Sequence, residues 1–260
     1  MAKEYKFYRG KETIIFDNEK KRHAYFDSKG NRLISVTGAT SIIDKSGALM
    51  GWTAKMIGLF LEENWERNRA YTQTEISTLI VRAKSEYRKV QKEAQDIGTD
   101  IHAWIEDWIA GKKPDMPSDE RVVNGITGFL KFQEEHKYKW IESEKMVYSR
   151  KHNYVGFFDA MARKGSKRIL VDFKSTNEKI DPKTGEVIEV PVYSESAFQT
   201  AGYQLAEEEE TKKKIDYRMT IAFGKRTGAF GFKEFKDNDQ DKEVFLNCLA
   251  IRRRLNELKG

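Results

Sequence analysis

Cysteine is nearly absent from the sequence, since Cys248 is the single cysteine among 260 residues. One thiol cannot build a disulfide framework, and it cannot supply the several sulfur ligands of a zinc or iron–sulfur centre. Long apolar runs are also missing, and the first residues, MAKEYKFYRGKET, contain no apolar signal-peptide core. We therefore expect a cytoplasmic protein with no iron–sulfur cluster and no membrane association.

The composition indicates a folded protein rather than a disordered one. Hydrophobic residues make up 39% of the chain and aromatic residues 12%, which provides enough apolar surface for one substantial core or two small domains. The formal net charge of +6 is compatible with a polyanionic partner. Charge alone does not identify that partner.

The first half of the chain combines short strands with long helices. Strands are predicted at residues 13–17, 23–27 and 32–37. Helices are predicted at residues 50–65 and, from an apolar repeat every three or four positions, at residues 76–108. The second stretch is either one long helix or two consecutive helices joined at Gly98-Thr99. Ser118 is expected to cap the next helix.

From Tyr138 onward, the pattern changes to strands with one intervening helix. Strands are predicted at residues 138–149, 154–164, 167–176, 216–225 and 228–235, and helices at residues 194–209 and near the C-terminus. We therefore predict one α/β domain over residues 1–260. Strands and helices of residues 1–137 precede a sheet core and a C-terminal helix in residues 138–260.

Residues 154–176, YVGFFDAMARKGSKRILVDFKST, form a predicted hairpin with charged residues inside apolar strands. Gly165-Ser166 fits a two-residue type II′ turn, because glycine adopts a positive φ without strain. A turn at this pair sets the register of the two strands. It places Lys164 opposite Lys167, Ala162 opposite Ile169, and Asp159 opposite Asp172.

Alternation along these two strands separates a charged face from an apolar face. Asp159, Asp172 and Lys174 are predicted to share the first face, whereas Phe158 and Phe173 belong to the second. Two carboxylates directly opposite each other repel. Lys174, a divalent cation, or both would compensate for this repulsion.

Four motifs resemble those of one nuclease superfamily and occur in the same order. Asp159 followed by Asp172-Phe173-Lys174 is similar to the D-(x)n-(D/E)-x-K motif of the PD-(D/E)XK superfamily. The other three are Gly98-Thr99-Asp100-Ile101-His102 with Glu106, Gly156-Phe157-Phe158-Asp159, and Gln199-Thr200-Ala201-Gly202-Tyr203. These resemble the histidine motif, the G-x-x-D motif and the Q-x-x-x-Y helix of the RecB-like branch, in which the proline before the first acid is usually absent, as it is here.

The resemblance covers residues 98–203 and implies a restriction-endonuclease-like fold. That fold is a central mixed β-sheet flanked by helices, here with a helical N-terminal half. It also implies the site for phosphodiester hydrolysis, in which hard divalent cations absorb the charge that develops at the phosphate. By resemblance, the metal ligands are His102, Asp159, Asp172 and the backbone carbonyl of Phe173. Lys174 would orient and help to deprotonate the attacking water.

Further side chains are placed beside these groups by helical spacing. Glu106 follows His102 by four residues and would orient the imidazole without binding the metal. Gln199 and Tyr203 are also four residues apart, so both would point toward the substrate phosphate and the active-site lysine. Glu144 is expected to be structural or to support the ligands from outside the metal site.

Two of these assignments have structural alternatives. Asp172 and Lys174 alone would also fit an ion pair of an exposed hairpin. His102 beside Trp104 and Trp108 would also fit a packed histidine. The presence of all four motifs favours the nuclease site over these alternatives.

Contacts with nucleic acid are predicted from cationic and aromatic residues. Phosphate contacts are predicted for Arg150, Lys151, Lys179, Lys225 and Arg226, and they would make DNA affinity strongly dependent on salt. Stacking on single-stranded bases is an alternative to core packing for Trp52, Tyr154 and Phe198.

We interpret the sequence as a deoxyribonuclease that uses Mg²⁺ or Mn²⁺, as one or two ions. Stand-alone phage-type members of the branch process DNA ends, which favours an exonuclease in recombination, repair or phage replication. A structure-specific endonuclease and a catalytically silent nucleic-acid-binding module of the same fold are the alternatives. DNA is the expected partner, and a recombinase or single-strand-binding protein would suit the same role. The sequence leaves strand polarity and oligomeric state open.

Overall fold

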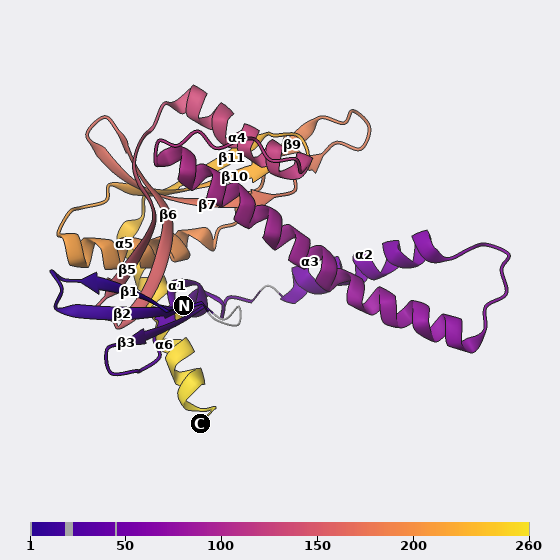
Figure 1. Cartoon of the computed structure of the whole chain (residues 1–260), viewed down its shortest axis with the longest axis horizontal. Helices are drawn as coiled ribbons and strands as arrows, with labels where there is room; N and C mark the ends of the chain where they lie inside the picture. Colours follow the sequence, from indigo (N-terminus) through magenta and orange to yellow (C-terminus); the bar gives the residue numbers. More distant parts are fainter. Residues whose placement is uncertain (1, 19–22, 45, 260) are drawn as a thin grey trace. The chain divides into compact units, whose positions relative to one another are not determined.

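The computed structural model describes residues 2–18, 23–44 and 46–259 (Figure 1). The chain forms a first compact unit, Met1–Ile43 with Ile101–Gly260, and a second unit, Asp44–Asp100. The boundary between the units falls within one long helix. A single domain over residues 1–260 stays a prediction.

Helices and strands form a mixed α/β pattern in the described residues, as predicted. The helices are α1 (Val36–Thr40), α2 (Ser46–Asn64), α3 (Gln73–Ile109), α4 (Glu120–His136), α5 (Ser196–Thr211) and α6 (Asn238–Glu257). The strands are β1 (Lys3–Phe7), β2 (Glu12–Asp17), β3 (Ala24–Asp27), β4 (Ile34–Ser35), β5 (Lys139–Ser149), β6 (Tyr154–Lys164), β7 (Lys167–Thr176), β8 (Lys179–Ile180), β9 (Val187–Glu189), β10 (Tyr217–Gly224) and β11 (Phe230–Phe235). Asp119, rather than Ser118, caps α4 by accepting the Arg121 N–H. Within the described residues, no helix is both long and apolar enough to span a membrane.

A mixed sheet lies at the centre of the first unit. In the described residues its strand order is β11-β10-β7-β6-β4, with β5 pairing to β6 outside this path. The β7–β10 and β4–β6 pairs are parallel, and the β5–β6, β6–β7 and β10–β11 pairs are antiparallel. On β7, Leu170 belongs to the cluster beneath α5, whereas Phe173 contacts Phe129 of α4, so the two helices cover opposite faces (Figure 1). This sheet flanked by helices confirms the predicted fold class.

The β6–β7 hairpin closes at Gly165, as the sequence predicts. Gly165 has a φ of 61°, a positive value that the first central position of a type II′ turn requires. The predicted register is confirmed from the turn to the pair of Ala160 with Val171. The ladder ends there, one position before Asp159.

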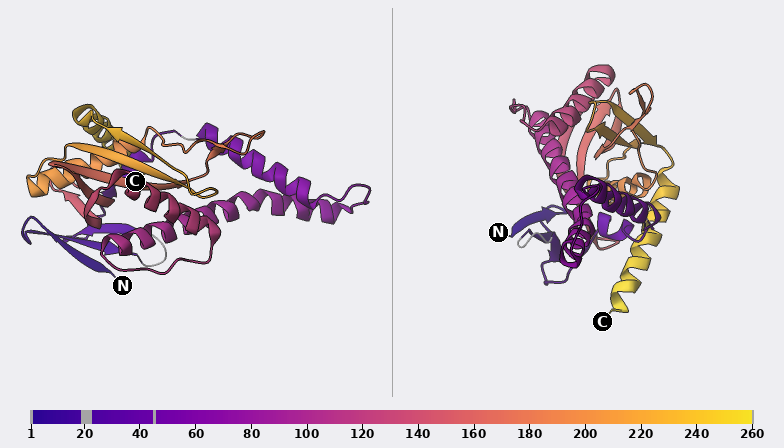
Figure 2. Two further views of the ribbon diagram at one scale, coloured as in Figure 1. Left: turned by 90° about the horizontal axis from the view of Figure 1, so that it is seen from above. Right: turned by 90° about the vertical axis from the view of Figure 1, so that its right-hand side faces the viewer.

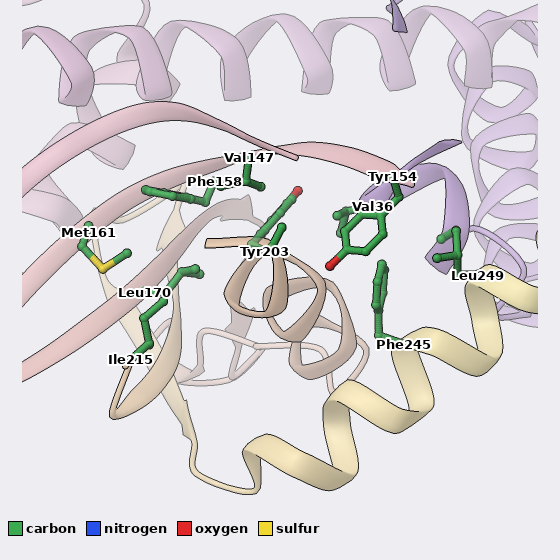
Figure 3. Packing of buried hydrophobic residues seen from close by; sticks show 12 residues of the cluster. Val36, Val147, Tyr154, Phe158, Met161, Leu170, Tyr203, Ile215, Phe245 and Leu249 are labelled. Carbon is green, nitrogen blue, oxygen red and sulfur yellow. The ribbon is translucent and has the colours of Figure 1, made fainter. Parts of the chain in front are cut away.

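Strand β6 departs from regular alternation at Asp159. Phe158 and Met161 both belong to the buried cluster beneath α5, although side chains three residues apart point to opposite faces of a regular strand (Figure 3). The prediction that Phe158 shares a face with Phe173 is therefore wrong, because β6 changes face between Phe158 and Met161. On β5, Glu144 has a φ of 46° and, like Asp159, is not a paired position, while the β5–β6 register shifts between Trp140 and Glu142.

Helix α5 is anchored firmly in the first unit. It packs against the sheet on one side and against α6 on the other, and α6 also packs on α1 (Figure 2). The Tyr154 hydroxyl of β6 donates to the Gly202 carbonyl at 2.7 Å. Arg218 is fully buried, donates to the Ala197 carbonyl at 2.6 Å, and pairs with Asp241 of α6 at 2.6 Å. These contacts fix the helix that carries the Q-x-x-x-Y motif.

The second unit consists of α2 and the N-terminal part of α3. Phe60, Leu79 and Ala83 form its buried cluster. Helix α3 continues through Gly98-Thr99 without a break, so the single-helix alternative is confirmed and the predicted joint is wrong.

Candidate active site

The central sheet contains a gap along one edge of β6. Strand β5 pairs along the opposite edge of β6. Along the edge that contains the gap, β7 pairs with residues 160–164 and β4 pairs with residues 154–155. Asp159 lies between the two paired stretches. The Phe173 N–H of β7 donates to Asp159 Oδ2 at 2.5 Å. The carboxylate thus occupies the position where a backbone carbonyl would continue the ladder.

Three side chains from three elements converge at this gap: His102 of α3, Glu144 of β5 and Asp159 of β6. His102 Nδ1 lies 3.6 Å from Asp159 Oδ1. One ligand atom from each of the three residues lies within 4.8 Å of the others. An imidazole nitrogen with two carboxylate oxygens is a donor set that suits a divalent transition metal such as Mn²⁺.

A second group of polar side chains surrounds Asp172, which is 1% exposed. Lys174 Nζ lies 2.8 Å from Asp172 Oδ1 and 2.7 Å from Oδ2. Gln199 of α5 donates to Asp172 Oδ1 at 3.1 Å and to the Tyr203 hydroxyl at 3.0 Å. Thr220 of β10 donates its hydroxyl to Asp172 Oδ2 at 3.4 Å. The structure therefore brings both acids, the lysine and the Q-x-x-x-Y side chains into one site.

The two aspartates have pKa values that shift in opposite directions. Burial raises the pKa of Asp159, but the charges of His102 and Lys174, with the hydrogen bond from the Phe173 N–H, outweigh burial and lower it. Burial also has the largest effect on the pKa of Asp172, and here it prevails over Lys174, with the charge of Asp159 adding to the increase. The repulsion between the two carboxylates therefore contributes to a raised pKa at Asp172, whereas the pKa of Asp159 stays lowered.

The carboxylates raise the pKa of both basic groups in the site. Burial lowers the pKa of Lys174, but the charges of Asp172 and Asp159 outweigh burial and raise it. Burial likewise lowers the pKa of His102, and the charge of Asp159, 3.6 Å away, raises it above the usual value. Lys174 is thus placed to compensate the charge of the two acids, as the sequence predicts.

Glu144 has the most perturbed glutamate pKa in the described part of the site. Burial, followed by the charge of Asp159, raises this pKa to about 7, and His102 opposes the increase. Sequence reasoning places Glu144 outside the metal ligands, whereas its carboxylate lies in the cluster with His102 and Asp159. Thr220 is not predicted for the site at all. The signal for Glu144 is a positive φ at a strand irregularity, which no sequence period encodes.

Other predicted site residues occupy the margins of this arrangement. Glu106 is exposed on α3, one turn after His102. The Phe173 ring is 2% exposed and packs against Trp140 and Phe223, so the backbone of this residue is the part available to the site.

Four of the residues predicted to contact phosphate fall in two turns, whereas Lys179 begins β8 and pairs with Glu189 at 2.6 Å. Arg150 and Lys151 lie between β5 and β6, where the Arg150 guanidinium stands 4.7 Å from the Tyr8 ring centre. Lys225 and Arg226 follow β10. Tyr154 is fully buried, so core packing, rather than stacking on bases, accounts for this tyrosine.

Comparisons with known proteins give likenesses of fold. No protein-family model matches the sequence, and no curated protein matches it significantly. Among solved structures, a candidate exonuclease from Eubacterium rectale shares 12% identity at a TM-score of 0.43, over 84% of this chain and 77% of its own. The alkaline exonuclease LHK-Exo from Laribacter hongkongensis shares 10% identity at a TM-score of 0.35, over 87% of this chain and 93% of its own. SSO0001 shares 13% identity at a TM-score of 0.32, over 81% of this chain and 87% of its own.

Likenesses of this size carry no argument about activity.

Proposed function

We propose that the chain is a metal-dependent deoxyribonuclease of the PD-(D/E)XK superfamily, in its RecB-like branch. One observation carries this proposal: residues of α3 and α5, which are separate in sequence from the β6–β7 hairpin, meet residues of that hairpin at the gap in the sheet. His102 stands beside Asp159, while Lys174 and Gln199 contact Asp172. An ordinary hairpin ion pair would require no contribution from α3 or α5.

The donor set fits a divalent cation such as Mn²⁺ or Mg²⁺. We assign His102, Glu144 and Asp159 as ligands from their mutual spacing, and Asp172 and the Phe173 carbonyl by resemblance. When bound, such a cation supplies positive charge to the scissile phosphate and to the leaving oxygen. It also provides the counter-charge that the crowded carboxylates require.

The lysine and the polar groups of α5 are assigned to substrate and water. The raised pKa of Lys174 means that it enters the reaction as an ammonium group. It would therefore orient the attacking water and stabilise charge on the phosphate, which is the part of its predicted role that the electrostatics favour. Gln199 would position Asp172 through one hydrogen bond and the Tyr203 hydroxyl through the other. Tyr203 would present this hydroxyl toward the phosphate.

Exonuclease action on DNA ends, in recombination, repair or phage replication, is the proposed mode. The test is digestion of end-labelled linear DNA and covalently closed circular DNA, single- and double-stranded, with Mg²⁺, with Mn²⁺ and with EDTA. Linear substrates should be degraded and circles spared, and EDTA should stop the reaction. Cleavage of circles would replace the exonuclease with an endonuclease. DNA binding without any cleavage would leave the silent binding module.

Glu144→Gln should stabilise the metal-free protein at alkaline pH and weaken its response to Mn²⁺. The pKa of Glu144 is about 7 in the folded chain, above its usual 4.5, so folding favours the protonated form. The associated stability is complete below the unfolded value and is lost as the pH rises through the folded value. At about pH 8 glutamine should therefore add about 1–3 kcal/mol to the free energy of unfolding, and at about pH 5 much less.

Melting temperatures in EDTA at these two pH values, followed by titration with Mn²⁺, test both parts of this expectation. Glu142→Gln is the matched control, because Glu142 lies on the same strand and pairs with Lys145 instead of joining the cluster. If Mn²⁺ stabilises Glu144→Gln as strongly as the wild type, Glu144 is not a ligand.

His102→Ala should weaken activation by Mn²⁺ more than activation by Mg²⁺. Imidazole suits transition metals, whereas Mg²⁺ prefers oxygen ligands. We expect Mn²⁺ to activate the wild type at lower concentration than Mg²⁺, and His102→Ala to lose about 10- to 100-fold in Mn²⁺-supported activity. Glu106→Gln should show a milder form of this effect. Melting temperature and both activation curves, measured on one preparation, decide the question, since a destabilised variant with unchanged curves would make His102 a packing residue.

A further inference from the structure

Lys225 is a buried cation that makes no ion pair within the described part of the chain. It directly follows β10 and is 9% exposed. Within the described residues, no carboxylate forms an ion pair or hydrogen bond with its ammonium group. Burial is the main cause of its lowered pKa, and the positive charge of Arg121 adds to the decrease. The charge of Glu178 opposes the decrease, but its effect is the smallest of the three. Such an unpaired charge is costly to the fold.

The nearby carboxylate of Glu178 holds the turn instead of neutralising Lys225. Glu178 is 5% exposed. It accepts hydrogen bonds from the Arg226 N–H at 3.2 Å, the Thr227 N–H at 2.8 Å and the Thr227 hydroxyl at 2.7 Å. Gly224 permits this approach, because a Cβ atom at that position would overlap the carboxylate. The acceptor capacity of Glu178 is thus used by the turn that carries the lysine.

Side chains of helix α4 fix the same turn by donating hydrogen bonds to the backbone carbonyl groups of the turn. The Asn124 amide donates to the carbonyls of Lys225 at 3.2 Å and Arg226 at 3.1 Å. Lys131 donates to the Gly228 carbonyl at 3.2 Å. The turn therefore has a defined conformation before any ligand arrives, which lowers the entropic cost of binding.

This turn lies at the end of the sheet beyond the candidate active site. Ala222 of β10 pairs with Lys174 of β7, and the Lys225 N–H donates to the Thr176 carbonyl at 3.0 Å. Lys225 follows Ala222 by three residues, which corresponds to about 10 Å along a strand. That length equals the rise of about three nucleotides in B-DNA. A DNA strand with its scissile phosphate at Lys174 would have another phosphate near this turn.

We propose that Lys225, with Arg226 beside it, binds a backbone phosphate of DNA a few nucleotides from the scissile phosphate. This inference rests on the proposed nuclease function and names a contact that positions the substrate. A phosphodiester supplies the ion-pair partner that Lys225 does not have among the described residues, and hydrogen bonds between charged groups are the stronger ones. Inorganic phosphate shares this chemistry, so the experiment has to distinguish the two sources.

Lys225→Met keeps the apolar stem of the side chain and removes the charge. Because an unpaired buried charge is lost, the melting temperature in EDTA should stay the same or rise. The affinity for a labelled single strand and a labelled duplex, measured by fluorescence anisotropy in EDTA, should fall. Between about 50 and 200 mM salt, the wild-type affinity should drop about threefold more than that of the variant, the contribution of one phosphate contact.

Two further variants complete the test. Lys225→Arg keeps the charge and should retain the wild-type salt dependence. Lys29→Gln removes an exposed lysine beside β3 and should alter neither stability nor salt dependence.

The possible outcomes separate this inference from the proposed function. If the wild type binds DNA and Lys225→Met keeps its salt dependence, the phosphate contact is overturned and the nuclease proposal stands. If the wild type binds neither the single strand nor the duplex, both proposals fail. If millimolar inorganic phosphate raises the melting temperature of the wild type but not of Lys225→Met, while both bind DNA with equal affinity at every salt concentration, the turn is a free-anion site and the DNA contact is overturned.

Discussion

Asp172→Asn should reduce DNA cleavage by at least about 100-fold, the effect expected when one preorganised electrostatic group is removed from a site. The substitution keeps the shape of the side chain, and the amide oxygen still accepts hydrogen bonds from Gln199 and Lys174. Burial already raises the pKa of Asp172, so its negative charge is unfavourable in the metal-free fold. The melting temperature in EDTA should therefore change by only a few degrees, and DNA affinity should be retained.

Cleavage of end-labelled DNA, melting temperature and DNA binding should be measured on the same preparation of this variant. Asp115→Asn is the matched control, because it removes the same charge from an exposed position and should leave all three unchanged. Thr220→Val removes only the 3.4 Å hydrogen bond to Asp172 and should reduce cleavage slightly. Turnover near the wild-type rate in Asp172→Asn would exclude the proposed active site.

The hairpin is the part of the fold that local sequence determines most directly. Gly165 sets the turn, and strand alternation then brings Asp172 and Lys174 to one face, two residues apart. The turn and the alternation of side chains both depend on residues that are close together in the chain, so the pattern of the residues is sufficient to predict them. The register of the confirmed pairs follows for the same reason.

The geometry around Asp159 depends on contacts that are remote in sequence. Strand β4 competes with β7 for the same edge of β6, and this two-residue strand lies more than one hundred residues earlier in the chain. Alternation predicts the wrong face for Phe158 because it assumes one continuous ladder. The positive φ of Glu144 likewise escapes strand alternation, which assumes an extended backbone at every position.

The continuity of α3 illustrates how packing overrides local propensity. Glycine inside a helix costs about 1 kcal/mol relative to alanine, which is why Gly98 suggests a joint. The neighbouring Ile97 and Ile101 are 5% and 0% exposed. Burial of two such side chains is worth about 1.5–3 kcal/mol each, so the helix continues through the glycine. Burial is the quantity that the sequence does not provide.

Lys174→Met should reduce cleavage by about 100- to 1,000-fold, the contribution of one preorganised group that stabilises charge in the transition state. The same substitution should strengthen Mn²⁺ binding. Lys174 is the cation closest to Asp172 and also acts on Asp159, so its removal leaves more negative charge for the metal. In EDTA the variant should melt a few degrees lower, because Asp172 loses its partner. The loss should be moderate, since the Lys174 side chain is 40% exposed and water screens part of the interaction.

The response to metal distinguishes this role from that of a hairpin ion pair. If the site binds a cation, Mn²⁺ should restore the melting temperature of Lys174→Met, because the cation replaces the missing positive charge, yet it should not restore cleavage. Calorimetric titration with Mn²⁺, melting curves with and without the metal, and cleavage assays measure these three effects. Lys164→Met, at the exposed end of the same hairpin, controls for the loss of a lysine. A variant that melts lower, gains nothing from Mn²⁺ and cleaves DNA at the wild-type rate would establish Lys174 as a structural ion-pair partner.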